Sequence, residues 1–168
     1  MNNSFRYISV FIGLVIFQVL VLNNVNLHGL INPYIYPLFI LLLPFEISGA
    51  ALLGLAFFIG LSIDLFMGTI GMHAFATVFM AATRPTIVRL FSQQKTEIKE
   101  PSINNNGFTW MVVYVGISLL IHHSVYFLIE ASSFNLLPSV LLRILCSSVI
   151  SLFLCIMLLY AFRKVKKR

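Results

Sequence analysis

The chain has 168 residues, of which 60% are strongly apolar and only 10% are charged. Soluble domains carry about 25% charged residues, so the composition excludes a water-soluble globule, a disordered chain and a coiled coil. It predicts an integral membrane protein in which residues 1–168 form a single transmembrane domain. The expected fold class is an all-α, polytopic membrane bundle.

Six apolar runs are predicted to cross the bilayer, and they cover residues 7–22, 30–43, 47–66, 72–88, 108–129 and 138–162. We expect the first run to be a retained anchor, because bulky Leu22 meets asparagines where a signal-peptide cleavage site needs small residues. The fourth run is long enough only if its helix continues through Arg84 and Pro85. In that case Arg84 is expected to extend toward the lipid headgroups.

The second run is unusual because it contains Pro33 and Pro37 and ends at Pro44. At about 1.5 Å per residue, residues 30–43 reach only about 21 Å across an apolar core about 30 Å thick. We therefore expect a bent or partly irregular span whose freed backbone groups are covered by neighbouring side chains. A re-entrant loop is the alternative.

Six spans place both termini on one side, and the charges indicate which side that is. The hydrophilic stretch 92–107 is predicted to be a loop on this side. Ten of the eleven basic residues are also predicted to lie on the side of the termini: Arg6, Arg84, Arg89, Lys95, Lys99, Arg163, Lys164, Lys166, Lys167 and Arg168. The positive-inside rule then predicts cytoplasmic termini, N-in and C-in.

The basic end of the chain should also attract anionic lipid headgroups, at about 1 kcal/mol per charge. Nucleic acid is not an expected partner, because no aromatic side chains that could stack on bases interleave with these charges.

Ionisable residues inside the spans gather in the outer half of the predicted bundle. Asp64 ends the third run, His73 begins the fourth, Glu130 closes the fifth and Arg143 lies within the sixth. Such residues are costly in a membrane and suggest pairing or function. The expected role is structural, with Asp64, Glu130 and Arg143 tying three spans together and Asp64 pairing with Arg143 or His73. Contact with a partner or ligand, and proton coupling, are the alternatives.

Two stripes of residues refine this picture. Small residues share one helix face with Asp64 in the third run, which predicts close helix packing, and a polar stripe in the sixth run should face inward. Gly68 and Gly71 bracket a tight turn between the third and fourth runs. The two stripes are Gly49, Ala56, Gly60 and Asp64, and Ser139, Arg143, Ser147 and Ser151.

No pattern in the chain predicts catalysis. A Ser-His-Asp order, a metalloprotease motif and nucleotide-binding glycine motifs do not occur in the sequence. His122 and His123 are adjacent, so their side chains project about 100° apart on a helix and are poorly placed to bind one metal ion. We therefore expect a protein that is not an enzyme and has neither a cofactor nor a metal.

The stretch GLAFFIGLSIDLFMGTIGMHA, residues 54–74, resembles the signature of the rod shape-determining protein MreD family. That family has a glycine-rich span ending in an aspartate, followed by a turn that contains glycine. Gly60, Asp64, Gly68 and Gly71 occupy these places, and Ile70 stands where the family favours leucine. The segment Ile31-Asn32-Pro33 before the second run looks similar too.

This resemblance implies a non-enzymatic subunit of the bacterial cell-elongation machinery, located in the cytoplasmic membrane. Its implied partners are MreC and, through MreC, MreB, RodA and a penicillin-binding transpeptidase of peptidoglycan synthesis. The family also resembles the S-components of energy-coupling-factor vitamin transporters in fold, so an S-component-like bundle is expected. A vitamin-binding S-component is the alternative function, and a proton-coupled carrier or exporter is disfavoured by the single acidic residue within a span.

The turn from Asp64 to His73 is the predicted docking site for a partner such as MreC. Its two glycines permit close backbone approach, and the adjoining loops carry no Lys or Arg. The alternative is that Gly68 and Gly71 only make a tight turn.

Overall fold

The computed structural model describes residues 3–25, 31–91, 101–131 and 137–161. In this part of the chain the regular elements are all helical, as the composition predicts. They are α1 (Asn3–Leu20), η1 (Leu22–Asn24), α2 (Leu38–Leu42), α3 (Gly49–Met67), α4 (Met72–Phe91), α5 (Ile103–Asn106), α6 (Phe108–Glu130) and α7 (Leu137–Ala161). Residue 30, the stretch 92–100 and residues 162–168, which include the basic end of the chain, lie outside the described residues.

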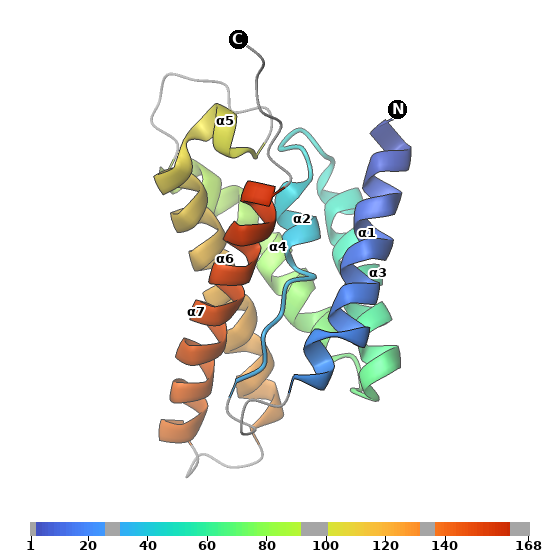
Figure 1. Cartoon of the computed structure of the whole chain (residues 1–168), viewed down its shortest axis with the longest axis vertical. Coiled ribbons are helices and arrows are strands. Elements are labelled where there is room, and N and C mark those ends of the chain that lie inside the picture. Colours follow the sequence, from blue (N-terminus) through green and yellow to red (C-terminus); the bar gives the residue numbers. More distant parts are fainter. Residues whose placement is uncertain (1–2, 26–30, 92–100, 132–136, 162–168) are drawn as a thin grey trace.

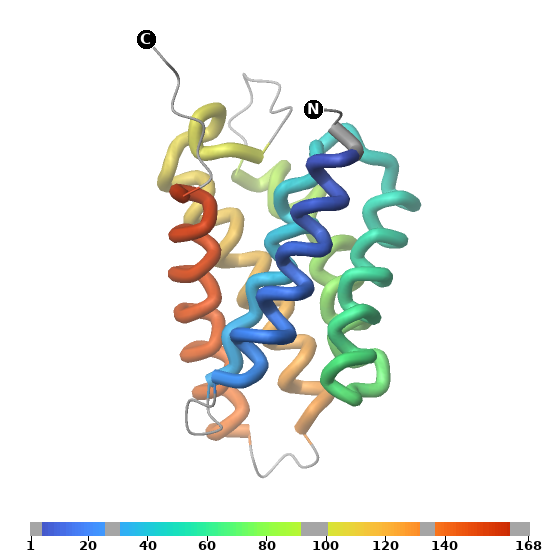
Figure 2. Tube along the Cα trace, turned by 45° about the vertical axis from the view of Figure 1, so that its right-hand side comes forward, coloured from blue at the N-terminus to red at the C-terminus, as the bar shows by residue number. Residues whose placement is uncertain are grey.

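The long helices lie side by side in one elongated bundle (Figure 1). The beginning of α1 and the end of α7 lie at the same end of this bundle, called here the terminal end, as both views show (Figure 2). The α3–α4 connection lies at the opposite end, the turn end. Among the described residues, four segments are long and apolar enough to cross a membrane, which is compatible with a multi-pass membrane protein: Phe5–Asn24, Gly49–Met67, Phe108–Glu130 and Leu137–Ala161.

The second apolar run forms a largely non-helical segment, as its prolines predict. Residues 31–37 lack regular helix, and only Leu38–Leu42 adopt it. The segment runs along the bundle from the turn end, where α1 finishes, to the terminal end, where α2 lies (Figure 1). It is buried almost throughout, so water cannot bind its free backbone groups.

Side chains from neighbouring helices bind these backbone groups instead. Gln18 of α1 accepts a hydrogen bond from Ile35 N at 2.8 Å and donates one to Pro33 O at 3.0 Å. On α7, Ser151 Oγ accepts a bond from Tyr34 N at 2.8 Å, and Ser147 Oγ accepts one from Asn32 N at 3.0 Å. The predicted coverage of the irregular span is confirmed. Ser147 and Ser151 of the polar stripe face inward, whereas Ser139 is exposed.

Helix α4 continues through Pro85 to Phe91, as predicted, but the expected position of the Arg84 side chain is wrong. Arg84 is only 2% exposed. Its guanidinium donates to the carbonyls of Leu43 and Pro44 and, through Nε, to the Tyr114 hydroxyl at 2.8 Å. These carbonyls follow the last turn of α2, so Arg84 caps that helix end instead of extending to the headgroups.

The predicted loop 92–107 also contains regular structure. Its last part forms the short helix α5, where Ser102 caps the N-terminus by accepting a bond from Asn105 N. Ile103 is buried, so this helix closes part of the terminal end of the bundle.

Candidate functional site

The α3–α4 hairpin at the turn end holds the residues that the sequence singled out. Gly68 ends α3 with φ 68°, and Gly71 precedes α4 with φ 74°. Both angles lie in the left-handed region, which glycine adopts without a steric cost. The backbone N–H groups of Gly68 and Thr69 both donate to Asp64 O, which closes the end of α3. The predicted tight turn is confirmed.

Gly60 sets the distance between the two helices. A Cβ atom at this position would lie 2.5 Å from Ala74 Cα and 2.7 Å from His73 O, closer than real Cβ contacts. The backbones of α3 and α4 therefore touch here, as the stripe of small residues predicts. Gly49 of the same stripe is exposed and does not take part.

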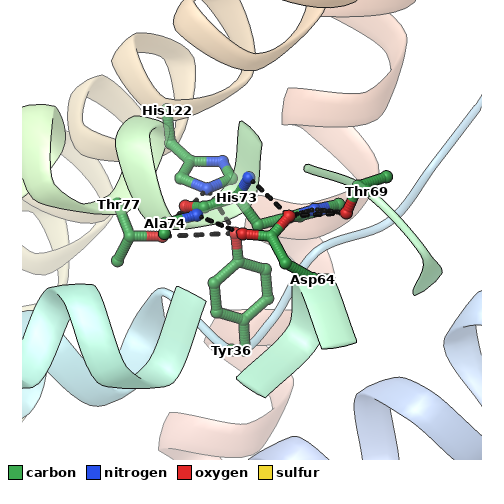
Figure 3. A network of polar contacts seen from close by, with 7 residues as sticks. All are labelled: Tyr36, Asp64, Thr69, His73, Ala74, Thr77 and His122. Carbon is green, nitrogen blue, oxygen red and sulfur yellow. Dashed lines mark hydrogen bonds and ion pairs between the residues drawn. The ribbon is translucent and has the colours of Figure 1, made fainter. Parts of the chain in front are cut away.

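The Asp64 carboxylate lies buried between these helices, with 3% of the residue exposed. Oδ1 accepts bonds from Thr69 Oγ1 at 2.5 Å and His73 N at 3.0 Å, and Oδ2 accepts one from Ala74 N at 2.9 Å. His73 Nδ1 lies 3.1 Å from Oδ1 (Figure 3). The carboxylate thus binds the first turn of α4, where free backbone N–H groups and the helix dipole favour a negative charge.

The polar network continues from this carboxylate toward α6. Thr77 Oγ1 donates to His73 O at 2.6 Å and lies 3.3 Å from the Tyr36 hydroxyl. This hydroxyl hydrogen-bonds to His122 Nε2 at 2.6 Å (Figure 3). One connected set of polar groups therefore joins α3, α4, the irregular segment and α6.

A third buried histidine, His123 of α6, connects the irregular segment with α7. His123 Nδ1 donates to Leu119 O at 2.8 Å, so its neutral ring offers Nε2 as an acceptor to Ser151 Oγ at 3.2 Å. The ring of Tyr34 stacks on His123 with a centroid distance of 5.3 Å, and it meets the ring of His73 edge-on at 5.1 Å. All three histidines therefore contribute to packing around the same segment.

Glu130 and Arg143 form a separate ion pair between α6 and α7. Arg143 Nη1 lies 2.7 Å from Glu130 Oε2, and its guanidinium lies over the ring of Phe127. Both side chains are partly exposed. The prediction that Asp64, Glu130 and Arg143 form one set is therefore wrong, because Glu130 and Arg143 pair with each other and Asp64 does not take part. Asp64 pairs with His73, so of its two predicted donors His73 is confirmed and Arg143 is wrong.

The hydrogen bonds around Asp64 determine what this site is able to bind. The Asp64 carboxylate already receives four donors, so neither oxygen is presented to a substrate or metal. In the part of the chain that the structure describes, no three His, Cys, Asp or Glu side chains are grouped to hold a metal ion. Two buried ring nitrogens, His73 Nε2 and His122 Nδ1, have no hydrogen-bond partner. The arrangement is that of a packed structural joint.

Several members of the network were missed by sequence reasoning. Tyr36 and Gln18 gave no signal, because neither is ionisable near neutral pH and their partners lie far along the chain. Thr77 stands four residues after His73, which is one helical turn, and this spacing was the available signal. Comparisons with protein-family models, curated proteins and solved structures gave no match for this chain.

Proposed function

We propose that this protein is a non-enzymatic, multi-pass subunit of the bacterial cell-elongation complex, similar to the MreD family. In this proposal it lies in the cytoplasmic membrane with six spans and both termini in the cytoplasm. It binds MreC, and through MreC it is linked to MreB, RodA and a penicillin-binding transpeptidase. The resemblance over residues 54–74 is the starting point, and the structure of that stretch supports it.

The observation that carries the proposal is that the four residues shared with the MreD signature each have a structural role in the α3–α4 hairpin. Gly60 allows the helices to touch, and Asp64 ties the end of α3 to the start of α4. Gly68 and Gly71 adopt the left-handed backbone conformations that the turn between the helices requires. All four residues build one rigid element, and none is presented as a catalytic group, as befits a scaffold subunit.

The tip of this hairpin offers a surface for the partner. Ile70 is 99% exposed, and Leu65 and Phe66 before the turn are exposed as well. A rigid tip can bind a partner without reordering its own backbone, which lowers the cost of association. We propose that a membrane anchor or stem segment of MreC docks here.

Site-specific photocrosslinking tests this proposal. A photoreactive residue at Ile70 is expected to capture the MreC protein of the same genome in intact cells, and one at the exposed Met67 should do so as well. The same probe at Lys95, in the predicted cytoplasmic loop, is the control and should capture MreC weakly or not at all.

Capture from Lys95 alone would contradict the docking site while leaving the partnership intact. No capture from any position would contradict the proposed function. Recovery of the energising subunits of a vitamin transporter would favour the alternative S-component function.

A further inference from the structure

The first half of helix α1 packs against the bundle only through partly buried side chains, among them Tyr7, Phe11 and Leu14. Val15 and Gln18 in its second half are buried, but residues 5–14 contain no buried side chain. A groove of about 630 Å³ opens between the first half of α1, the residues around α2 and the N-terminal half of α3. This groove is remote from the Asp64 network, which lies at the turn end.

The lining of the groove is apolar except at one point. Ile8 and Phe11 come from α1, Phe39 and Leu43 from the irregular segment and α2, and Phe58 from α3. Among the described residues that line it, Glu46 alone carries a charge. Both Ile8 and Phe58 are exposed, so the groove opens laterally at the bundle surface.

The volume indicates what kind of occupant fits. Small-molecule sites measure about 300–1,000 Å³, which includes the volume of this groove. An unbranched hydrocarbon chain fits both the size and the apolar lining.

The charges at the same end complement a zwitterionic headgroup. Arg6 is exposed and directly precedes Tyr7, which lines the groove, while Glu46 is exposed at its edge. Arginine favours phosphate oxygens, and a carboxylate favours an ammonium group. A lipid with phosphate and a primary amine in its headgroup satisfies both.

We propose that this groove binds one acyl chain of a phospholipid with an amine headgroup, phosphatidylethanolamine, whose phosphate contacts Arg6 and whose ammonium contacts Glu46. The proposal depends on the membrane location in the proposed function but not on any protein partner. Bound lipid fills the groove that side chains of α1 and α3 both line.

Native mass spectrometry of the full-length, detergent-purified and delipidated protein tests this. Added phosphatidylethanolamine should bind as one saturable adduct, with an affinity about tenfold higher than that of phosphatidylglycerol.

Ile8→Trp fills the groove from an exposed position and should weaken binding about tenfold or more. Ile12→Trp, on an exposed site of α1 outside the groove, is the matched control and should bind like the wild type. Glu46→Gln leaves the apolar lining intact and should remove the preference between the two lipids.

Equal binding by the wild type and Ile8→Trp would overturn the proposal, as would equal affinity of the wild type for both lipids. A dimer that Ile8→Trp abolishes would overturn it in favour of a second copy. Because the purified protein is tested alone, lipid binding can fail while MreC crosslinking succeeds, and the reverse is equally distinguishable.

Discussion

Asp64 is a buried charge whose surroundings are built to accept it. Three of its donors belong to the first turn of α4 (His73 N, His73 Nδ1 and Ala74 N), and the fourth is the Thr69 hydroxyl of the turn. Burial of an unpaired carboxylate in an apolar interior is costly, so such a residue persists only with a full set of partners. The Asp64 carboxylate therefore holds the end of α3 and the first turn of α4 in one specific arrangement.

Asp64→Ala is expected to destabilise the protein by about 3–5 kcal/mol, since it leaves buried donors, among them a histidine side chain, without an acceptor. The thermal unfolding midpoint in detergent and the abundance in membranes should both fall. Ser62→Ala is the matched control, because Ser62 Oγ donates only to Phe58 O within its own helix. If Asp64→Ala and Ser62→Ala unfold at the same temperature, Asp64 does not hold the hairpin together.

At the scale of the elements, α3 and α4 approach closely because one position lacks a side chain. Gly60 faces the backbone of His73 and Ala74 across the helix contact. In a membrane, helices are held together by packing and hydrogen bonds and not by exclusion of water. The Asp64 bonds and the Gly60 contact thus depend on each other, since the carboxylate reaches α4 only at this separation.

Gly60→Ala should force the helices apart and cost about 1–3 kcal/mol, as overpacking of a tight contact does. Gly54→Ala in the same helix is the control. Its added Cβ would meet nothing within 4 Å, so the higher helix propensity of alanine should leave stability unchanged or raised by about 0.5–1 kcal/mol. Thermal unfolding of both variants in the same detergent measures the difference, and equal losses of stability would show that Gly60 is not a contact point.

The irregular segment is the other element that depends on its neighbours. It contributes the large buried side chains Tyr34, Ile35 and Tyr36 to the core, yet it lacks the internal hydrogen bonds of a helix. Gln18, Ser147, Ser151 and Arg84 bind its backbone from three different helices. Non-helical backbone at membrane depth is tolerated only when protein surrounds it in this way.

For the whole molecule, the shared position of the two chain ends agrees with the charge distribution. The start of α1 and the end of α7 lie at one end of the bundle (Figure 2). Ten of the eleven basic residues belong to that side in the predicted topology. Basic residues are retained on the cytoplasmic face of bacterial membranes, so the terminal end should face the cytoplasm.

Fusions of reporter proteins measure this orientation. A fluorescent protein that folds only in the cytoplasm should be active when fused after Arg168, and alkaline phosphatase fused there should be inactive. Phosphatase inserted in the turn at Thr69 should be active. Active phosphatase after Arg168 would contradict the six-span topology.

The sequence by itself determined the properties that depend on composition and on local spacing. The charge content predicted apolar helices, the prolines predicted an irregular second segment, and the spacing of Gly60, Asp64, Gly68 and Gly71 predicted a tightly packed hairpin. These features arise within one element or between neighbours in the chain, so local rules are sufficient to find them.

Only the tertiary structure decided which polar groups meet. Arg84 caps a helix end 41 residues before it, Tyr36 bonds to His122 across 86 residues, and Asn32 bonds to Ser147 across 115. For the same reason the sequence left both Arg143 and His73 as possible donors for Asp64, whereas in the structure Asp64 pairs with His73 and Arg143 with Glu130. A buried polar group without a partner is costly, but which partner it finds is fixed by how whole helices pack, and no local pattern encodes that arrangement.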